Sequence, residues 1–439
     1  MKKKLSAVLA AIIVLTSLTA CGGNGTEVDS AGSDGAAATT TAAVTTAPLT
    51  EEELSKVVAY VDKDGADPEH FNITYGDFNR EYQFYLGNNG KDENNEEDKS
   101  ACEQYRRSII EFLTTERITL YLADQKGMGI DDLTEEELEE INSTVEETLE
   151  QWYISYESEA KAALGEEATE EQIREKEIEL FNEFMDSCGL EHDIFYTWQK
   201  NSYVQQKLME SEFADIDITD GEITAFLDET IAEAKECYEN DIATYETSNT
   251  YKAVYIPEGT KNIRQIMLSF GDDDLQAISN FRNSDDNETA DALRDQLAEM
   301  KQGEADKIMQ RLADGEDFAA ISKEYNGSDS EYEFTVVPNS SLCSKELLEI
   351  VDSLENEGDY SQPTVTDYGL LIIQYSSTPK VTEEDMENLR LSAEDYLLYE
   401  AKTERSSRLL EQWKTEFPYV IDYAALRLED PNTVSSDGE

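Results

Sequence analysis

Two apolar runs, Ile263-Arg264-Gln265-Ile266-Met267 and Gly369-Leu370-Leu371-Ile372-Ile373, are predicted to be β-strands. Between them the sequence predicts a polar, Asp- and Asn-rich loop over residues 271–287. Helices are predicted over residues 290–313 and 345–354, where apolar residues recur at helical spacing. A strand, several helices and a closing strand fit one small α+β domain.

The sequence on either side of this domain predicts helices. Thr134-Glu135-Glu136-Glu137 and Thr169-Glu170-Glu171-Gln172 are capping boxes, and each precedes apolar residues at helical spacing. We therefore expect a mainly helical domain over residues 50–250, completed by one long helix over residues 380–428. A single amphipathic helix cannot bury its own apolar stripe, so the last helix should pack on the N-terminal helices. The expected fold is α+β multidomain, with the α+β domain of residues 260–378 inserted into a discontinuous helical domain.

The N-terminus predicts export. Residues 1–20 combine three lysines with a short apolar core, as a secretory signal does. The segment Leu18-Thr19-Ala20-Cys21 resembles the bacterial lipobox, whose cysteine is acylated and becomes the new N-terminus. This resemblance implies that Cys21 carries a lipid anchor, which would place the protein on the extracytoplasmic face of the cell membrane. Residues 21–49 are expected to form a flexible Thr/Ala/Gly stalk and residues 429–439 a polar tail.

Composition excludes several classes of function. With 98 acidic and 35 basic residues the formal net charge is −63, so nucleic acid is not an expected partner. The chain has only two histidines, His70 and His192, which argues against most metal and triad chemistry. Besides Cys21, four cysteines lack the CxxC spacing of zinc or redox sites: Cys102, Cys188, Cys237 and Cys343. We expect no metal and no cofactor.

The order of these segments resembles that of the PrsA/SurA-type extracytoplasmic foldases, which carry an inserted parvulin-type peptidyl-prolyl isomerase domain. The resemblance is carried by short stretches in matching order: Asn72-Ile73-Thr74-Tyr75-Gly76-Asp77-Phe78, Asp217-Ile218-Thr219-Asp220-Gly221-Glu222-Ile223, residues 312–322 and residues 358–369. It implies a membrane-anchored foldase or chaperone whose partners are unfolded or newly exported polypeptides.

The same resemblance locates the positions of the isomerase site. Active relatives use two facing histidines, a Cys or Asp, and apolar Met and Phe side chains that line a slot for the proline ring. In this sequence Gln265 and Leu371 stand at the two histidine positions, and neither of the chain's histidines lies in the segment. Asp329 or Ser328 falls near the Cys/Asp position, while Leu342 and Leu347 fall near the substrate-binding Met and Phe positions. We therefore expect the isomerase domain to be catalytically degenerate.

Three other functions are open on sequence grounds. Gln265 can still hydrogen-bond and the isomerisation needs no nucleophile, so an active isomerase is the first alternative. A solute-binding lipoprotein of a transporter would share the lipobox and the stalk, but normally has two lobes of alternating strands and helices. A structural protein of the cell envelope without clients is the third.

Overall fold

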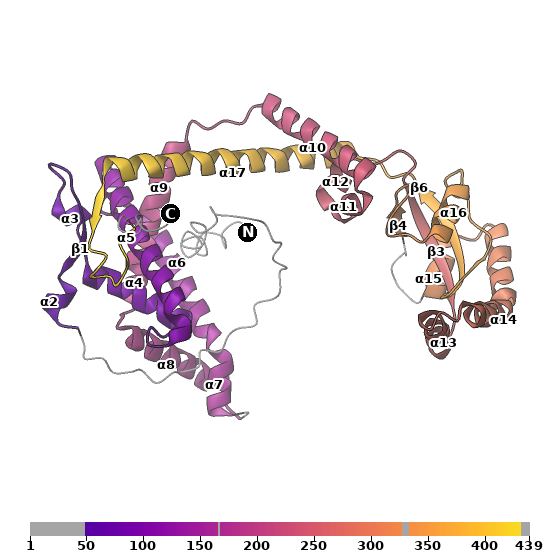
Figure 1. Ribbon diagram of the computed structural model, residues 1–439, viewed down its shortest axis with the longest axis horizontal. Coiled ribbons are helices and arrows are strands. Elements are labelled where there is room, and N and C mark those ends of the chain that lie inside the picture. Colours follow the sequence, from indigo (N-terminus) through magenta and orange to yellow (C-terminus); the bar gives the residue numbers. More distant parts are fainter. Residues whose placement is uncertain (1–48, 166, 327–332, 432–439) are drawn as a thin grey trace, which may run out of the picture. The chain divides into compact units, whose positions relative to one another are not determined.

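The computed structural model describes residues 49–165, 167–326 and 333–431 (Figure 1). The chain divides into two compact units: unit 1 comprises Met1–Ile216 and Ala401–Glu439, and unit 2 comprises Asp217–Glu400. The described residues are mainly helical with two small antiparallel sheets, which confirms the expected α+β class. Within these ranges no helix is both long and apolar enough to cross a membrane. Cys21 and Asp329 lie outside the described residues.

Unit 1 is a helical layer with a small sheet. Its main helices are α4 (Tyr75–Asn88), α5 (Lys99–Gln125), α6 (Glu135–Ser155), α7 (Glu157–Leu164), α8 (Glu170–Cys188) and α9 (Asp193–Phe213). Short helices α2 (Glu51–Leu54) and α3 (Pro68–Phe71) and two 3₁₀ turns, Glu96–Asp98 and Ile130–Asp132, complete it. The sheet has the order β2-β1-β7, formed by Ile73–Thr74, Val57–Val61 and Tyr419–Ile421. Strand β7 comes from the far end of the chain and pairs with β1.

These short strands add a small sheet to the mainly helical domain that we expected over residues 50–250. The run Val57–Val61 is rich in β-branched residues, but its partner β7 lies more than three hundred residues later. The helix starts, by contrast, are confirmed. The Thr134 side chain accepts a hydrogen bond from the backbone N–H of Glu137, and the backbone N–H of Thr134 donates to the Glu137 side chain. Thr169 and Gln172 make the same two hydrogen bonds.

Unit 2 is built around a four-stranded antiparallel sheet of order β4-β3-β6-β5. Its strands are β3 (Lys261–Ser269), β4 (Glu333–Val336), β5 (Thr364–Thr366) and β6 (Gly369–Ser377). Its helices are α10 (Asp220–Asn240), α11 (Ile242–Thr247), α12 (Asn249–Val254), α13 (Asp272–Asn283), α14 (Asn287–Ala313), α15 (Phe318–Asn326) and α16 (Lys345–Ser353), together with the first part of α17 (Glu383–Glu416).

Helix α13 corrects the polar loop that we expected over residues 271–287. Three acidic residues, Asp272 to Asp274, occupy its first turn, where the helix dipole favours negative charge. Leu275 and Ile278 follow at helical spacing and pack in the core of unit 2. The helix was not predicted because its apolar residues are few and the segment is rich in Asp and Asn, as loops are.

The two faces of the unit 2 sheet have different partners. Ile266, Leu268, Leu370 and Ile372 lie on one face, in a cluster with the buried residues of α13, α14 and α15. The opposite face carries Ile263 and Leu371, among others, and packs with side chains of α16. Successive side chains of a strand point to opposite faces, so the register of β3 against β6 decides which residues meet under α16.

Helix α17 contributes to both units. Its first part, including Leu389 and Ala393, packs with Ile223 and Leu227 of α10 in unit 2. Its second part, including Trp413, packs in unit 1 with side chains of α5 and α9. Helices α10 to α12 belong to unit 2, whereas we expected them inside a helical domain that runs to residue 250. The difference arises because these helices pack with one another, with α17 and with the loop before α16.

Gly369, the first residue of β6, provides a test of the strand pairing. Its φ is +151°, and a Cβ atom there would lie 2.2 Å from the carbonyl oxygen of Leu268 on β3. We expect Gly369→Ala to destabilise unit 2 by about 2–3 kcal/mol, because backbone atoms cannot move aside cheaply. Gly303→Ala on α14, where a Cβ meets nothing within 4 Å, should instead stabilise by about 0.5–1 kcal/mol.

Urea unfolding followed by circular dichroism would measure both changes. The three tryptophans, Trp152, Trp198 and Trp413, all belong to unit 1, so their fluorescence reports on that unit alone. The tryptophan-detected midpoint should not move in either variant. A Gly369→Ala protein with the wild-type circular dichroism midpoint would contradict the prediction.

Candidate functional site

Gln265 and Leu371 share the face of the sheet that α16 covers. Gln265 pairs directly with Ile373, and Leu371 pairs with Met267, so the two residues are diagonal neighbours on adjacent strands. Leu371 is 6% exposed and belongs to the apolar cluster beneath α16. The side-chain amide of Gln265 is half-buried and makes no hydrogen bond with any described residue. The second of the two histidine positions is therefore occupied by an aliphatic core side chain, that of Leu371.

The backbone of Gln265 is held by α15. The pairing of β3 with β4 ends at Arg264, so the next backbone groups of β3 need other partners. Ser322 Oγ and Asn326 Nδ2 both donate to the Gln265 carbonyl oxygen, at 2.7 and 2.8 Å. Asn326 Oδ1 accepts the Met267 N–H at 3.0 Å. The Asn326 amide thus takes the place of a strand and fixes the position of Gln265.

The two predicted substrate-binding leucines have different surroundings. Leu347, on α16, is half-buried and packs in the same cluster as Leu371. Leu342 is 71% exposed in the turn before α16 and is not part of that cluster. The structure therefore brings Gln265, Leu347 and Leu371 to one face and leaves Leu342 in solvent.

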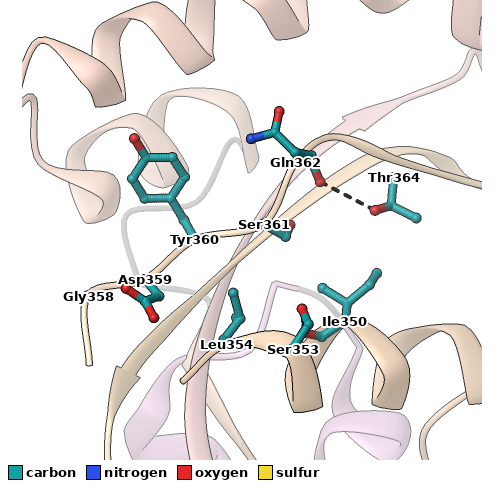
Figure 2. A pocket seen from close by; sticks show the side chains of 9 residues that line it. All are labelled: Ile350, Ser353, Leu354, Gly358, Asp359, Tyr360, Ser361, Gln362 and Thr364. Carbon is teal, nitrogen blue, oxygen red and sulfur yellow. Dashed lines mark hydrogen bonds between the residues drawn. The ribbon is translucent and has the colours of Figure 1, made fainter. Parts of the chain in front are cut away.

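A shallow, open depression of about 620 Å³ lies beside the C-terminal end of α16 (Figure 2). Ile350, Ser353 and Leu354 line it from α16 and its end, and the segment from Gly358 to Thr364 lines the opposite wall. This segment runs along β6: the Ser361 N–H donates to the Ile373 carbonyl at 2.8 Å, and the Ile373 N–H donates to Ser361 Oγ at 3.0 Å.

Of the predicted site residues that the structure describes, none lines this depression. Figure 2 shows the side chains of Tyr360 and Gln362 on the segment, with the Thr364 hydroxyl donating to the Gln362 carbonyl at 3.3 Å. In the sequence, residues 358–369 indicate the fold through their family resemblance and were not predicted to line a depression. The one sequence feature that points to this wall of the depression is the polar stretch Tyr360-Ser361-Gln362, which directly precedes a proline.

The loop between β4 and α16 is fastened to helix α11 by a buried carboxylate. Glu246 accepts hydrogen bonds from Ser340 Oγ, from the Ser341 N–H at 2.8 Å and from Ser341 Oγ at 2.7 Å. Close by, the Tyr238 hydroxyl donates to the Pro338 carbonyl at 2.9 Å. Burial would raise the pKa of Glu246, but the hydrogen bonds from Ser340 and Ser341 outweigh it and hold the pKa below its usual value.

Taken together, these groups form an apolar cluster beneath α16 and an open depression beside it. Catalysis of X-Pro rotation needs an apolar slot and polar groups that favour the twisted amide over the planar one. Leu371 and Leu347 occupy the apolar space with each other, and both histidines of the chain lie in unit 1. The open depression offers hydroxyl, amide and apolar surface.

Glu246 provides a test of how the loop before α16 is positioned. We expect Glu246→Ala to lower the stability of unit 2 by about 1–3 kcal/mol at neutral pH, because Ser340 and Ser341 lose their acceptor. The folded pKa of Glu246 is depressed, so its contribution is present above the unfolded value of 4.5 and is lost as pH falls through the folded value.

The difference between Glu246→Ala and wild type should therefore be largest above pH 5 and should shrink toward pH 3, measured by urea unfolding at several pH values. Glu239→Ala, at an exposed position of α10, is the matched control and should leave stability unchanged. A deficit in Glu246→Ala that grows on acidification would contradict this account.

No protein-family model and no curated protein matches the sequence. Solved structures of PrsA are similar to it: PrsA from Bacillus subtilis at 13% identity, the peptidylprolyl isomerase PrsA from Bacillus cereus at 17%, and the foldase protein PrsA from Streptococcus pneumoniae at 12%. The matches cover 82%, 80% and 86% of this chain and 93%, 92% and 96% of those chains, in the same order. Their TM-scores are 0.21, 0.19 and 0.19, which are too low to decide fold or function.

Proposed function

We propose that this protein is a membrane-anchored extracytoplasmic foldase that holds newly exported polypeptides, and that its parvulin-like domain binds without catalysing isomerisation. The sequence resemblance to PrsA/SurA-type foldases and the export signal support the class. The discontinuous helical unit 1 and the four-stranded sheet of unit 2 are compatible with it.

The proposed loss of catalysis is supported mainly by the packing of Leu371. At a position where active relatives place a histidine, this chain has an aliphatic side chain that is 6% exposed and surrounded by apolar neighbours. A histidine in such surroundings could be replaced by leucine only if the polar function were no longer needed. The diagonal neighbour Gln265 keeps a free amide but is rigidly placed by Asn326 and Ser322.

Two assays on one protein test this proposal. A molar equivalent of the chain should suppress aggregation of a chemically unfolded protein on dilution. It should leave the rate of a refolding step limited by X-Pro isomerisation, which takes about 10–100 s uncatalysed, within about twofold of the spontaneous value. Gln265→Ala should behave as wild type in both assays. Acceleration of more than tenfold that falls in Gln265→Ala would instead establish an active isomerase.

The location is part of the proposal. An acylated Cys21 would hold the folded units at the outer face of the membrane, where newly exported chains emerge. Multiple acyl chains on one residue would make this anchoring stable, whereas one chain alone would be marginal.

Expression in a bacterium with radiolabelled palmitate tests the anchor. The wild-type protein should take up label and sediment with membranes, while Cys21→Ala should do neither. Cys237→Ala is the control, since Cys237 is a half-exposed free thiol in unit 2 that should have no part in anchoring. Equal labelling of Cys21→Ala and wild type would refute the anchor without touching the proposed chaperone activity.

A further inference from the structure

Helix α10 and the first part of α17 pack together within unit 2 (Figure 1). Leu389, Ala393 and Leu397 recur every four residues on α17 and pack with Ile223 and Leu227 of α10. This contact covers one side of the first part of α17.

The first part of α17 exposes four large apolar side chains. Met386, Leu391, Tyr396 and Tyr399 are 37%, 51%, 49% and 64% exposed. Tyr396 stacks on Phe226 of α10, with ring centroids 5.3 Å apart, and Tyr399 lies one turn further along. Leu391, Tyr396 and Tyr399 fall within the half of the helix that borders or faces away from the stripe packed on α10, whereas Met386 falls on the side of that stripe. Single exposed apolar residues are ordinary, but three within one half of a helix make a patch that a partner would cover.

The surroundings of this patch carry one sign of charge. Residues 220–240 of α10 contain seven acidic residues and one basic residue, and residues 383–400 of α17 contain the same numbers. The basic residue of α17, Arg390, is paired with Asp220 at 2.7 Å. An apolar patch inside so negative a field attracts a segment that is both apolar and positively charged.

We propose that the exposed face of α17 between Leu391 and Tyr399 is a docking site for cationic, apolar segments of unfolded polypeptides. The proposal rests on the chaperone function proposed above and names the class of client. Apolar and aromatic side chains of the client would cover Leu391 and Tyr399, while its Lys and Arg side chains would face the acidic residues of both helices. A second copy of this strongly acidic chain would bring like charges together at the same face, which disfavours it as the occupant.

Fluorescence anisotropy with two labelled peptides tests the site on the intact chain. One 15-residue peptide alternates Lys with Leu and Tyr, and the other has Glu at every Lys position. We expect the Lys peptide to bind and the Glu peptide to fail. Binding should weaken at least about tenfold from 50 to 500 mM salt, because exposed charges are screened.

The decisive variant is Leu391→Ser/Tyr399→Ser, which should bind the Lys peptide at least about tenfold more weakly, equivalent to about 1.4 kcal/mol. Its matched control is Met300→Ser/Tyr368→Ser, which removes an aliphatic and a tyrosine side chain of similar exposure, 67% and 68%, elsewhere in unit 2. The control should bind within twofold of wild type, and both variants should unfold at the wild-type midpoint because these side chains are exposed.

Equal binding of the two peptides, equal weakening in both double variants, or a dimer that only Leu391→Ser/Tyr399→Ser abolishes would overturn the proposal. Failure of the wild-type chain to suppress aggregation would contradict the proposed chaperone function itself. If Leu391→Ser/Tyr399→Ser suppresses aggregation normally and binds the Lys peptide normally, only the α17 site would be contradicted.

Discussion

The antiparallel pairing of β3 with β6 is the constraint on which the rest of unit 2 depends. It joins residues 261–269 to residues 369–377 at the centre of the sheet, with β4 and β5 added at the edges. Its closest approach is at Gly369, where only a residue without a Cβ fits against Leu268. Because the side chains of a strand alternate, this one register sends Ile266 and Ile372 to α13–α15 and Leu371 to α16.

The same register decides what surrounds the two positions that resemble the histidine positions of active isomerases. It places Leu371 in the same apolar cluster as Leu347, and this cluster is the core that holds α16 on the sheet. Asn326 then satisfies the backbone of β3 beyond the end of β4. Glu246 fastens the loop before α16 to helix α11. The positions that resemble an active site are thus used for stability, and exposed apolar surface is found elsewhere, on α17.

Sequence patterns predicted the parts of the fold that depend on neighbours in the chain. The capping boxes at Thr134 and Thr169 mark helix starts correctly because their hydrogen bonds close within four residues. Helix α13 was missed because its apolar positions are few and its polar content resembles a loop. Strand β1 was missed because its pairing with β7 is long-range. Of the residues predicted for the candidate site, the structure brings Gln265, Leu347 and Leu371 to one face of the sheet and leaves Leu342 in solvent.

The sequence by itself determined the helix starts, the two central strands of unit 2, the lack of histidine between them and the strongly acidic surface, since each is a local or compositional property. Only the tertiary structure decided which side chains share a face of the sheet, which partner completes the edge of β3, and which side of α17 stays exposed. Those outcomes depend on contacts between residues far apart in the chain, such as Glu246 with Ser341 and Leu227 with Ala393, for which no local pattern carries a signal.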